Sequence, residues 1–560
     1  MTGRIRIRRE TLSDDAIAGL VLGVESVPDG LAAGILAGVN PLSGLYGYMF
    51  GTLAGSVTTS SSFMAVQATG AMAVIISDVP AVHTSSDPAR ALFTLAMVTG
   101  LIMVIVGLLK LGSALRFVSN AVMVGFIGAV GVNIVLGQLA NFTGYKAAGA
   151  NRVARAVNTL IHPGQLHLGT VLIGTATIVL IVILERTKLG ALGLVVAVVA
   201  TSAAVAIFHL TDVAILDDLS TIPRSLPVPQ APLLGLVPVL LVPALSLAFV
   251  GLVQGAAVSA NFPNPDGSYP DASGDFVGQG VANVVSGVFQ GMPVGGSMSA
   301  SALNKVAGAK SRMALIISSV VMTIVILVFA GLVGHIAMPA LAGLLIVIGC
   351  RTIKPGDLWS VWKTGLVPKV VVTTTFVLTM LIALQYAVLV GVGLSIILHV
   401  VRQSNEVTVR RWTFDGHGNT IEGDPPEQLP ADESVVLQPY GSLFFAAAPV
   451  FEAGLPEVTA DSHNSVVILR LRGRTDLDTT FLGVLVRYAE SLTAVDSKLA
   501  IVSASDRVRE QLDQGGVTSM VGQENIYIGD ERVGAAVKRA NRDALDWIAA
   551  HGKGSEDESP

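Results

Sequence analysis

Long apolar runs without charge constrain this chain more than any other feature of its sequence. Only 13% of its 560 residues are charged and 52% are hydrophobic, whereas soluble domains carry roughly 25% charged residues. A membrane-spanning helix needs about 20 apolar residues. Runs that meet or approach this length are Ala91–Leu109, Phe117–Ala140, Leu168–Leu184, Leu189–Phe208 and Met313–Gly334, and Val370–Leu398 can hold two short spans joined by a tight turn. The sequence therefore predicts a polytopic α-helical membrane protein.

The composition divides the chain into five regions. Residues 1–13 form a basic N-terminus, and residues 14–403 are apolar and predict a transmembrane transport domain. Residues 404–434 are polar and contain proline, which predicts a linker. Strand-like and helix-like segments alternate over residues 435–550, which favours a small α/β domain. Residues 551–560 are polar and predict a disordered tail.

Several function classes have no support in the sequence. The single cysteine, Cys350, excludes an internal disulfide framework and a thiolate metal cluster. The histidines show no metal-ligand spacing, and neither a phosphate-binding loop nor a nucleophile elbow is present in the sequence. We therefore expect no enzyme activity, no cofactor, no metal and no nucleic-acid partner.

Basic residues at the ends of the apolar runs predict the orientation of the chain. With about fourteen spans, the N-terminal arginines and most later basic groups fall on one side, which the positive-inside tendency makes cytoplasmic. Lys146, Arg152 and Arg155 are the exceptions and fall outside. An even number of spans then places both termini in the cytoplasm of a cell-membrane protein.

The first apolar segment contains groups that a simple membrane anchor does not need. Between Val27 and Tyr46 it holds Pro28, Asp29 and several glycines. Ionisable residues in hydrocarbon are costly and usually functional, and a broken helix must find partners for its free backbone groups. This pattern predicts an interrupted first span that carries part of a transport site.

Two other segments, one in each half of the chain, are short and rich in glycine and serine. These are Ser60–Ile76 and Met292–Ala309. Paired interrupted segments of this kind are typical of inverted-repeat transporters, in which the N-termini of two half-helices offer amides and positive dipole ends to an anion. The alternative is that their small residues only allow close helix packing.

These residues resemble a known family. Pro28-Asp29-Gly30, Ala37-Gly38, Pro41 and Gly44-Leu45-Tyr46 resemble the first-span signature of the SulP, or sulfate permease, family of anion transporters, and residues 278–283 and 291–297 resemble its ninth and tenth spans. Residues 439–445 and 476–480 resemble its cytoplasmic STAS domain. The resemblance implies fourteen spans as two inverted repeats of seven, a core domain that moves against a gate domain, and a C-terminal STAS domain. It also implies a homodimer in the lipid bilayer and a cytoplasmic regulator that acts through the STAS domain.

The resemblance also implies which residues bind the substrate. They are Asp29 and Ala33 in the first span, Thr69 and Gly70 in the third, Gln254 in the eighth, and Ser297, Met298, Ser299 and Ala300 in the tenth. Hydroxyl groups and backbone amides at these positions suit an anion.

Departures from the family pattern sharpen the prediction. Asp29 replaces the glutamine usual at its position, and Glu25 lies one turn before it, so two carboxylates share a helix face. Such a pair is suited to carry a proton. The alternative reading places Glu25 at a water-filled gate or beside a lysine.

Two further departures concern charge at the substrate site. Gln254 stands where many relatives have an acidic residue, and Val258 where sodium-coupled relatives have a hydroxyl, which argues against a sodium site. Ala300 stands where many relatives have arginine. The pocket then lacks a side-chain cation unless Lys305 reaches back, which favours a monovalent anion or an organic acid taken up with a proton.

In the STAS-like region, Asp478-Thr479-Thr480-Phe481 replaces the pattern Asp-Ser-Thr-Gly. In related bacterial anti-sigma antagonists the serine is phosphorylated, so Thr479 is a candidate regulatory residue. The alternative, which we favour, is that Thr479 caps the helix predicted over Phe481–Leu492.

The sequence as a whole predicts secondary active transport of a small anion, one resembling sulfate, bicarbonate, chloride or a dicarboxylate, with a proton carried by Asp29. One alternative is a transporter of the same fold for a neutral or weakly acidic solute such as a nucleobase. Another is a non-transporting membrane scaffold that presents the STAS domain to signalling partners.

Overall fold

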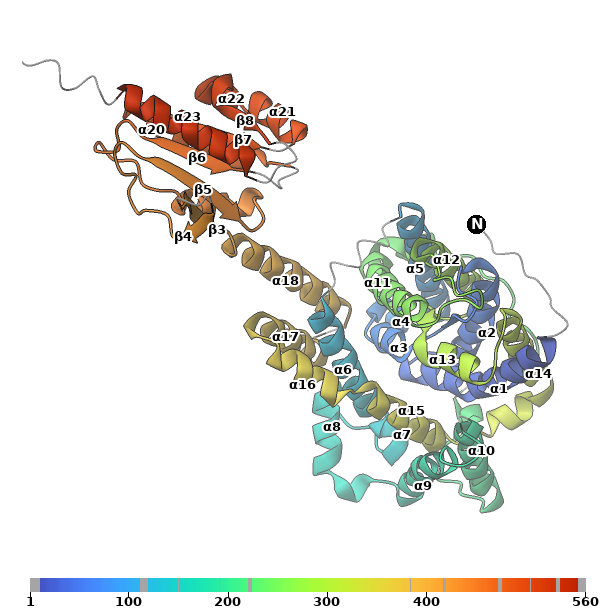
Figure 1. The fold of residues 1–560 in the computed structure, drawn as a ribbon. Coiled ribbons are helices and arrows are strands. Elements are labelled where there is room, and N and C mark those ends of the chain that lie inside the picture. Colours follow the sequence, from blue (N-terminus) through green and yellow to red (C-terminus); the bar gives the residue numbers. More distant parts are fainter. Residues whose placement is uncertain are drawn as a thin grey trace, which may run out of the picture. The chain divides into compact units, whose positions relative to one another are not determined.

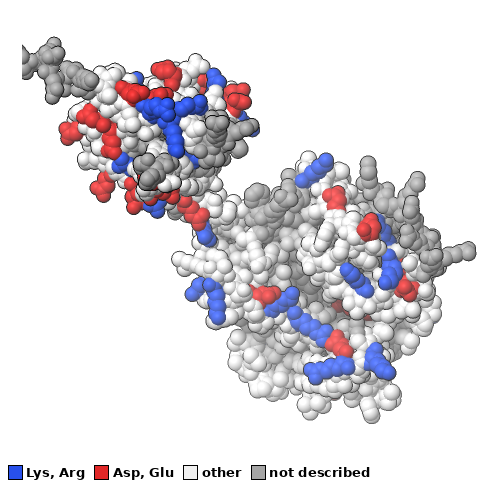
Figure 2. All heavy atoms as spheres, in the orientation of Figure 1, with Lys and Arg blue, Asp and Glu red and all other residues white. Residues whose placement is uncertain are grey.

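Charge density separates the chain into two units. The structure is a computed structural model that describes residues 11–110, 119–149, 151–190, 192–219, 224–382, 384–415, 419–471, 476–503, 505–529 and 534–551. The chain divides at Ser395 into two compact units (Figure 1). Figure 2 shows Lys, Arg, Asp and Glu crowded on the second unit, while the visible face of the first unit is mostly uncharged. Most of the predicted N-terminus (1–13) and tail (551–560) lies outside the described residues.

The first half of the first unit contains ten helices and one short strand among its described residues. They are α1 (Leu12–Leu36), α2 (Pro41–Thr58), β1 (Ala65–Gln67), α3 (Gly70–Ser77), α4 (Pro80–Thr84), α5 (Pro88–Leu108), α6 (Asn120–Gly137), α7 (Leu139–Thr143), α8 (Arg152–Ile161), α9 (Leu168–Leu184) and α10 (Leu192–Ile207). Short 3₁₀ turns follow at Pro163–Gln165, Leu216–Asp218 and Leu234–Leu236.

The second half begins in the same order, with two helices, a short strand and a short helix. It contains α11 (Val237–Asn261), α12 (Ala272–Val288), β2 (Gly295–Ser297), α13 (Met298–Val306), α14 (Met313–Gly334), α15 (Met338–Thr352), α16 (Pro355–Lys363), α17 (Leu366–Leu381) and α18 (Leu384–Asn405). The run Val370–Leu398, expected to form two short spans, indeed falls on two helices, α17 and α18.

Six helical stretches of the described residues are long and apolar enough to cross a membrane, and four shorter apolar helices accompany them. The six are Leu12–Leu36, Pro88–Leu108, Asn120–Thr143, Leu234–Asn261, Met313–Gly334 and Met338–Lys363. The expectation of a polytopic helical membrane domain is therefore confirmed at this level.

One expectation about the first span was wrong. α1 runs without interruption from Leu12 to Leu36 with Pro28 inside it, where the sequence had suggested a broken helix. A proline removes the one amide that would bond to the carbonyl of residue 24. Membrane helices tolerate such a loss when neighbouring groups are close, so α1 passes through Pro28 and ends only at Ala37.

The helices of the first unit form two groups. The first helix group contains α1–α5 and α11–α14, and the second contains α6–α10 and α15–α17 (Figure 1). Glycines allow close packing inside the first group: a Cβ on Gly100 of α5 would lie 2.5 Å from the carbonyl oxygen of Gly280 on α12. Two helices can approach this closely only where neither carries a side chain.

A partly buried ion pair joins the two helix groups. The guanidinium of Arg152 on α8 lies 2.8 Å from Oδ1 of Asp78, which follows the last residue of α3. The same group donates to the carbonyl oxygen of Val74 at 3.4 Å and to the hydroxyl of Ser77. A second ion pair, between Glu185 and Arg351, lies within the second group, where it joins the ends of α9 and α15.

The second unit is an α/β domain around one mixed sheet with strand order β4-β3-β5-β6-β7-β8. Its strands are β3 (Thr408–Phe414), β4 (Thr420–Gly423), β5 (Ser434–Tyr440), β6 (Val466–Arg470), β7 (Lys498–Ser503) and β8 (Ile526–Ile528). Its helices are α19 (Ala448–Ala453), α20 (Thr479–Thr493), α21 (Asp506–Gln514), α22 (Val517–Val521) and α23 (Ala535–His551), with 3₁₀ turns at Phe445–Ala447 and Gln523–Asn525. Strands β5 to β8 pair in parallel, and β3 pairs antiparallel with both neighbours.

Helices cover both faces of this sheet. Val467 and Leu469 of β6 pack into a core with Phe481 of α20, whereas Val466 and Ile468 face a second core with Val537 of α23. Strands buried on both faces read as continuous apolar runs, which explains the sequence Val-Val-Ile-Leu in β6.

The predicted linker, residues 404–434, contains two strands of this sheet. β3 and β4 lie within it and pair in register, with Trp412 opposite Glu422. Their polar composition hid them in the sequence. Arg410 and Arg411 of β3 form ion pairs with Asp424 and Glu433, so these charges belong to paired strands and do not indicate an unstructured segment.

Candidate functional site

Two half-helices in the first helix group begin at the two ends of one short strand pair. β1 and β2 pair antiparallel, with Ala65 opposite Ser297 and Gln67 opposite Gly295. Each strand leads directly into a short helix, α3 after β1 and α13 after β2. Because the strands run in opposite directions, α3 and α13 leave the pair in opposite directions, each from one end of the three-residue pair. The first amides of a helix have no partner within it and carry a partial positive charge.

Side-chain hydroxyls cap both half-helices. Thr69 is the N-cap of α3, and its Oγ1 accepts from the amide of Met72 at 3.4 Å. Ser297 is the N-cap of α13, and its Oγ accepts from the amide of Ala300 at 3.4 Å. Ser299 lies 3.3 Å from Ser297, oxygen to oxygen. Each cap engages one amide of its helix.

Helix α11 packs against β2 of the strand pair. Thr69 donates through Oγ1 to Oε1 of Gln254 at 2.8 Å. The close approach depends on glycine, because a Cβ on Gly296 would lie 2.6 Å from the Cα of Gly255. Gln254 therefore reaches the N-terminus of α3, as the family resemblance implied.

Two fully buried amides of α12 hold β2 in place. Gln279 accepts from the amide of Gly296 at 2.9 Å. Asn283 accepts from the amide of Val294 at 2.8 Å and donates to its carbonyl oxygen at 2.6 Å. In the sequence both residues stand out only as part of residues 278–283, which resemble the ninth span of the family. Their role is to satisfy backbone groups of a strand that has one partner strand.

One stripe of α1 faces the strand pair. Leu22 packs with Ala65 of β1 and Ala300 of α13, and Ser26 accepts from Nε2 of Gln67 at 3.0 Å. Positions spaced by three or four residues share a helix face. Asp29 and Ala33 continue this stripe, so the helix presents Asp29 on the side of the half-helices.

The carboxylate of Asp29 has a specific partner. Tyr48 of α2 donates its hydroxyl to Oδ2 of Asp29 at 2.7 Å. Glu25 lies one turn earlier on α1, and both carboxylates are half-buried. Sequence reasoning missed Tyr48, although Gly30 and Gly44 indicate close packing of α1 on α2 near both residues.

The candidate residues differ in exposure. Thr69, Gly70 and Gln254 are half-buried, and Met298 and Ser299 are exposed. Ala33, Ser297 and Ala300 are buried. Since Ala300 packs among Leu22, Ala65 and Leu315, Ser299 and not Ala300 is the open position at the N-terminus of α13.

Lys305 does not supply a cation to these N-termini. It lies in the last turn of α13, and its ammonium sits over the rings of Phe63 and Phe262, 5.6 and 5.5 Å from their centroids. The half-helix site is thus built from hydroxyls, amides and backbone dipoles. The described residues also contain no group of three or more His, Cys, Asp or Glu that could hold a metal ion.

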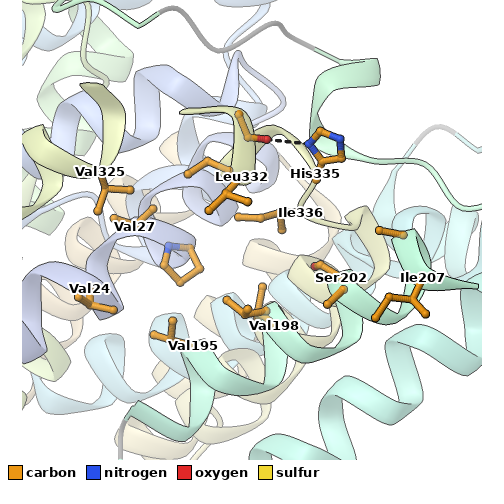
Figure 3. Close-up of a pocket in the computed structure, with 16 residues that line it drawn as sticks. Val24, Val27, Val195, Val198, Ser202, Ile207, Val325, Leu332, His335 and Ile336 are labelled. Atoms are coloured by element: carbon orange, nitrogen blue, oxygen red, sulfur yellow. Dashed lines mark hydrogen bonds between the residues drawn. The ribbon is translucent and has the colours of Figure 1, made fainter. Parts of the chain in front are cut away.

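A separate apolar cavity lies on another face of α1. Its volume is about 510 Å³, and α1, α10 and α14 line it with residues such as Val27, Val198 and Val325 (Figure 3). His335 lies at its edge and shares a hydrogen bond of 2.7 Å with the carbonyl oxygen of Gly331. Apart from Ser202 and His335 its lining is apolar, and none of the half-helix residues Thr69, Gln254, Ser297 and Ser299 lines it.

The expected cap in the second unit was misplaced by one residue. Asp478, and not Thr479, is the N-cap of α20, and its Oδ1 accepts from the amide of Thr480 at 2.9 Å. Thr479 is the first helical residue and is exposed. A carboxylate caps a helix and also complements its dipole, which explains why Asp478 takes this position.

Comparisons with known proteins agree with the fold. The profile of the sulfate permease family matches residues 12–375, and that of the STAS domain matches residues 427–528. The Bacillus subtilis protein described as "Putative sulfate transporter YvdB" is 27% identical over 523 residues, which are 92% of this chain and 95% of that protein. The "Bicarbonate transporter BicA" of a Picosynechococcus strain is 26% identical over 539 residues, 92% of each chain. These relatives are transporters and not enzymes.

A solved structure shows the same architecture. The murine Slc26a9 anion transporter in the inward-facing state aligns with a TM-score of 0.84 at 18% identity, over 97% of this chain and 92% of that chain. This likeness confirms a helical membrane transporter fold followed by a C-terminal STAS domain.

Proposed function

This chain belongs to the sulfate permease family, and from that premise we propose that it is a secondary active transporter of a small anion that works by alternating access. The observation that carries the proposal is the antiparallel pairing of β1 and β2, which places the N-termini of two half-helices at the two ends of one three-residue strand pair. Amides and dipole ends at helix N-termini favour anions. A nucleobase or scaffold role has no comparable support.

Charge at the site bears on the substrate. The relatives' names include sulfate and bicarbonate. Ala300 is buried and Lys305 is engaged by two rings, so dipoles rather than a side-chain cation face the anion. This arrangement favours a monovalent anion such as bicarbonate or chloride, or a dicarboxylate taken up with a proton, over fully ionised sulfate.

The order of elements supports fourteen spans in two inverted repeats of seven. The first repeat comprises α1, α2, α3, α5, α6, α9 and α10, and the second comprises α11, α12, α13, α14, α15, α17 and α18. In each, a strand leads into the third helix. The first helix group is then the core domain and the second the gate domain.

The remaining assignments follow from this topology. An even number of spans puts both termini in the cytoplasm of a cell-membrane protein. We also propose a homodimer, and a cytoplasmic regulator that acts on the STAS domain with Thr479 as its site. Thr479 is exposed at the start of a 15-residue helix, a position that accommodates a phosphate.

Asp29 is the proposed coupling group. It lies on the α1 stripe that faces the half-helices, with Glu25 one turn away. In the cycle, Asp29 takes a proton from water on one side of the membrane together with the anion. It returns that proton to water on the other side.

Uptake into proteoliposomes tests this function. Labelled sulfate, bicarbonate, chloride and succinate are offered with and without an inward proton gradient, and the dye pyranine reports lumen pH. We expect at least one anion to accumulate faster with the gradient and to acidify the lumen. Asp29→Asn should lose the part of anion uptake that the proton gradient drives. Undiminished gradient-driven uptake in that variant would contradict the coupling role of Asp29. If all four anions fail to enter, the choice of substrate class is wrong.

A further inference from the structure

We propose that Tyr48 is the positioning residue for Asp29, so that the coupling group is a carboxylate–tyrosine pair contributed by two helices. This inference rests on the proposed function and adds a residue to it. It explains why a carboxylate in the first span keeps one orientation toward the half-helices.

The contact is short, and it is built into the packing of two helices. The Tyr48 hydroxyl lies 2.7 Å from Oδ2 of Asp29, and Tyr48 is only 4% exposed. Its ring lies against Gly30, where a Cβ would come within 3.2 Å of the tyrosine Cγ and 3.0 Å of the Cα of Leu45. Glycine at position 30 therefore lets the ring reach α1.

Few other titratable groups face Asp29 from the helices that pack on α1. The described parts of α3, α10 and α14 contain no Asp, Glu, Lys, Arg, His, Tyr or Cys. α2 contributes Tyr46 and Tyr48, α1 itself contributes Glu25, and α13 contributes Lys305, which is held over two rings. The titratable groups of α15 are Cys350 and Arg351, in its last turn, and Arg351 is paired with Glu185. Tyr48 is thus the donor that defines the Asp29 environment.

The bond assigns a role to each carboxylate oxygen. A tyrosine hydroxyl donates one proton in one direction, so Oδ2 is committed to Tyr48. The transported proton is then taken up and released at Oδ1. Loss of the hydroxyl frees the carboxylate to rotate away from the half-helices, and anion and proton no longer share one site.

The test compares four variants by proton-driven uptake of the same four labelled anions. Hydrogen bonds to charged groups contribute about 1.5–3 kcal/mol, and 1.4 kcal/mol corresponds to tenfold. Tyr48→Phe, which keeps the ring, should therefore lower the gradient-driven uptake rate about tenfold. Tyr46→Phe, two residues away on the same helix, is the matched control and should stay within about twofold of wild type.

The double variant separates positioning from a structural role. If Tyr48 acts through Asp29, Tyr48→Phe leaves unchanged the gradient-independent uptake that remains in Asp29→Asn. A further loss of that remaining uptake in the double variant, or full gradient-driven uptake in Tyr48→Phe alone, overturns the proposal. If Asp29→Asn itself keeps gradient-driven uptake, the proposed coupling function fails first, and the two failures are distinguished.

A spectroscopic readout needs no transported substrate. pH-difference infrared spectra of the purified protein contain a carboxyl band that disappears in Asp29→Asn and so reports that group. We expect this band to shift in Tyr48→Phe and to stay in place in Tyr46→Phe. An unchanged band in Tyr48→Phe contradicts the hydrogen bond and with it the inference.

Discussion

Thr69 and Gln254 are the two residues whose side chains meet beside the N-terminus of α3. Their hydrogen bond of 2.8 Å links a half-helix cap to α11, and neither residue carries a charge. An anion that approaches this point meets a hydroxyl, a carboxamide and helix amides. A negative charge on any of these groups would therefore weaken the binding of an anion at the proposed site.

Replacing Gln254 by glutamate tests this dependence. Gln254→Glu keeps the shape and the acceptor oxygen but adds a negative charge, and two unit charges 4 Å apart interact by about 4 kcal/mol at an effective dielectric constant of 20. We expect the KM for anion uptake at pH 8 to rise at least tenfold. Gln290→Glu, at a half-buried position away from the half-helices whose side chain bonds the carbonyl of Val228, should leave KM within about twofold. Equal KM values in the two variants would show that the site lies elsewhere.

At the scale of elements, periodicity and composition predicted much of the fold. The apolar runs gave α5, α9, α14 and the α17–α18 pair, and the two glycine- and serine-rich segments proved to be the strand–half-helix units. Composition could not reveal the strands β3 and β4, because their charged residues have partners that lie beyond the neighbouring residues in sequence. Arg410 and Arg411 look like linker charges until Asp424 and Glu433 lie beside them.

The candidate site shows the same division. Thr69, Gln254 and Ser297 were named from the family pattern. Thr69 bonds Gln254, and Ser297 lies opposite Ala65 in the strand pair, while their role in substrate binding stays a prediction. The sequence did not point to Tyr48, because its role comes from a contact between two helices. The sequence could not predict where the ammonium of Lys305 lies, because a long flexible side chain can adopt several conformations. The prediction that Pro28 interrupts the first span was wrong, because the loss of one amide does not end a well-packed helix.

Amide exchange can test which residue caps the N-terminus of α20. Asp478 caps it and Thr479 does not. Loss of an N-cap costs about 1 kcal/mol, or a factor of about five in local opening. Amide exchange of residues 479–493 in the full-length protein should therefore be about fivefold faster in Asp478→Ala and nearly unchanged in Thr479→Ala. The reverse ranking would restore Thr479 as the cap.

At the scale of the whole molecule, alternating access requires the two helix groups to move against each other. The Arg152–Asp78 ion pair joins them, because α8 belongs to the second group and Asp78 ends the half-helix α3 of the first. The pair is only 13% and 19% exposed at its two side chains. A contact so placed must open and close as the groups move.

Cross-linking measures whether it does. In a Cys350→Ala background, Asp78→Cys/Arg152→Cys is joined by a short, reducible bis-methanethiosulfonate reagent, which spans the gap left by the arginine side chain. We expect anion uptake to fall more than tenfold and to recover on reduction. The matched control is Glu185→Cys/Arg351→Cys, which joins α9 to α15 inside one group and should keep uptake within about twofold. Full activity of the cross-linked Asp78/Arg152 variant would exclude movement at this contact.

The β1–β2 pair has a consequence for how the chain is made. The amide of Ala65 donates at 3.0 Å to the hydroxyl of Ser301, 236 residues later, and β2 is synthesised in the same late stretch. Until then β1 has no strand partner, and unpaired backbone groups cannot rest in lipid. During biosynthesis the strand pair, and with it the proposed anion site, therefore cannot form before β2 and Ser301 have been synthesised.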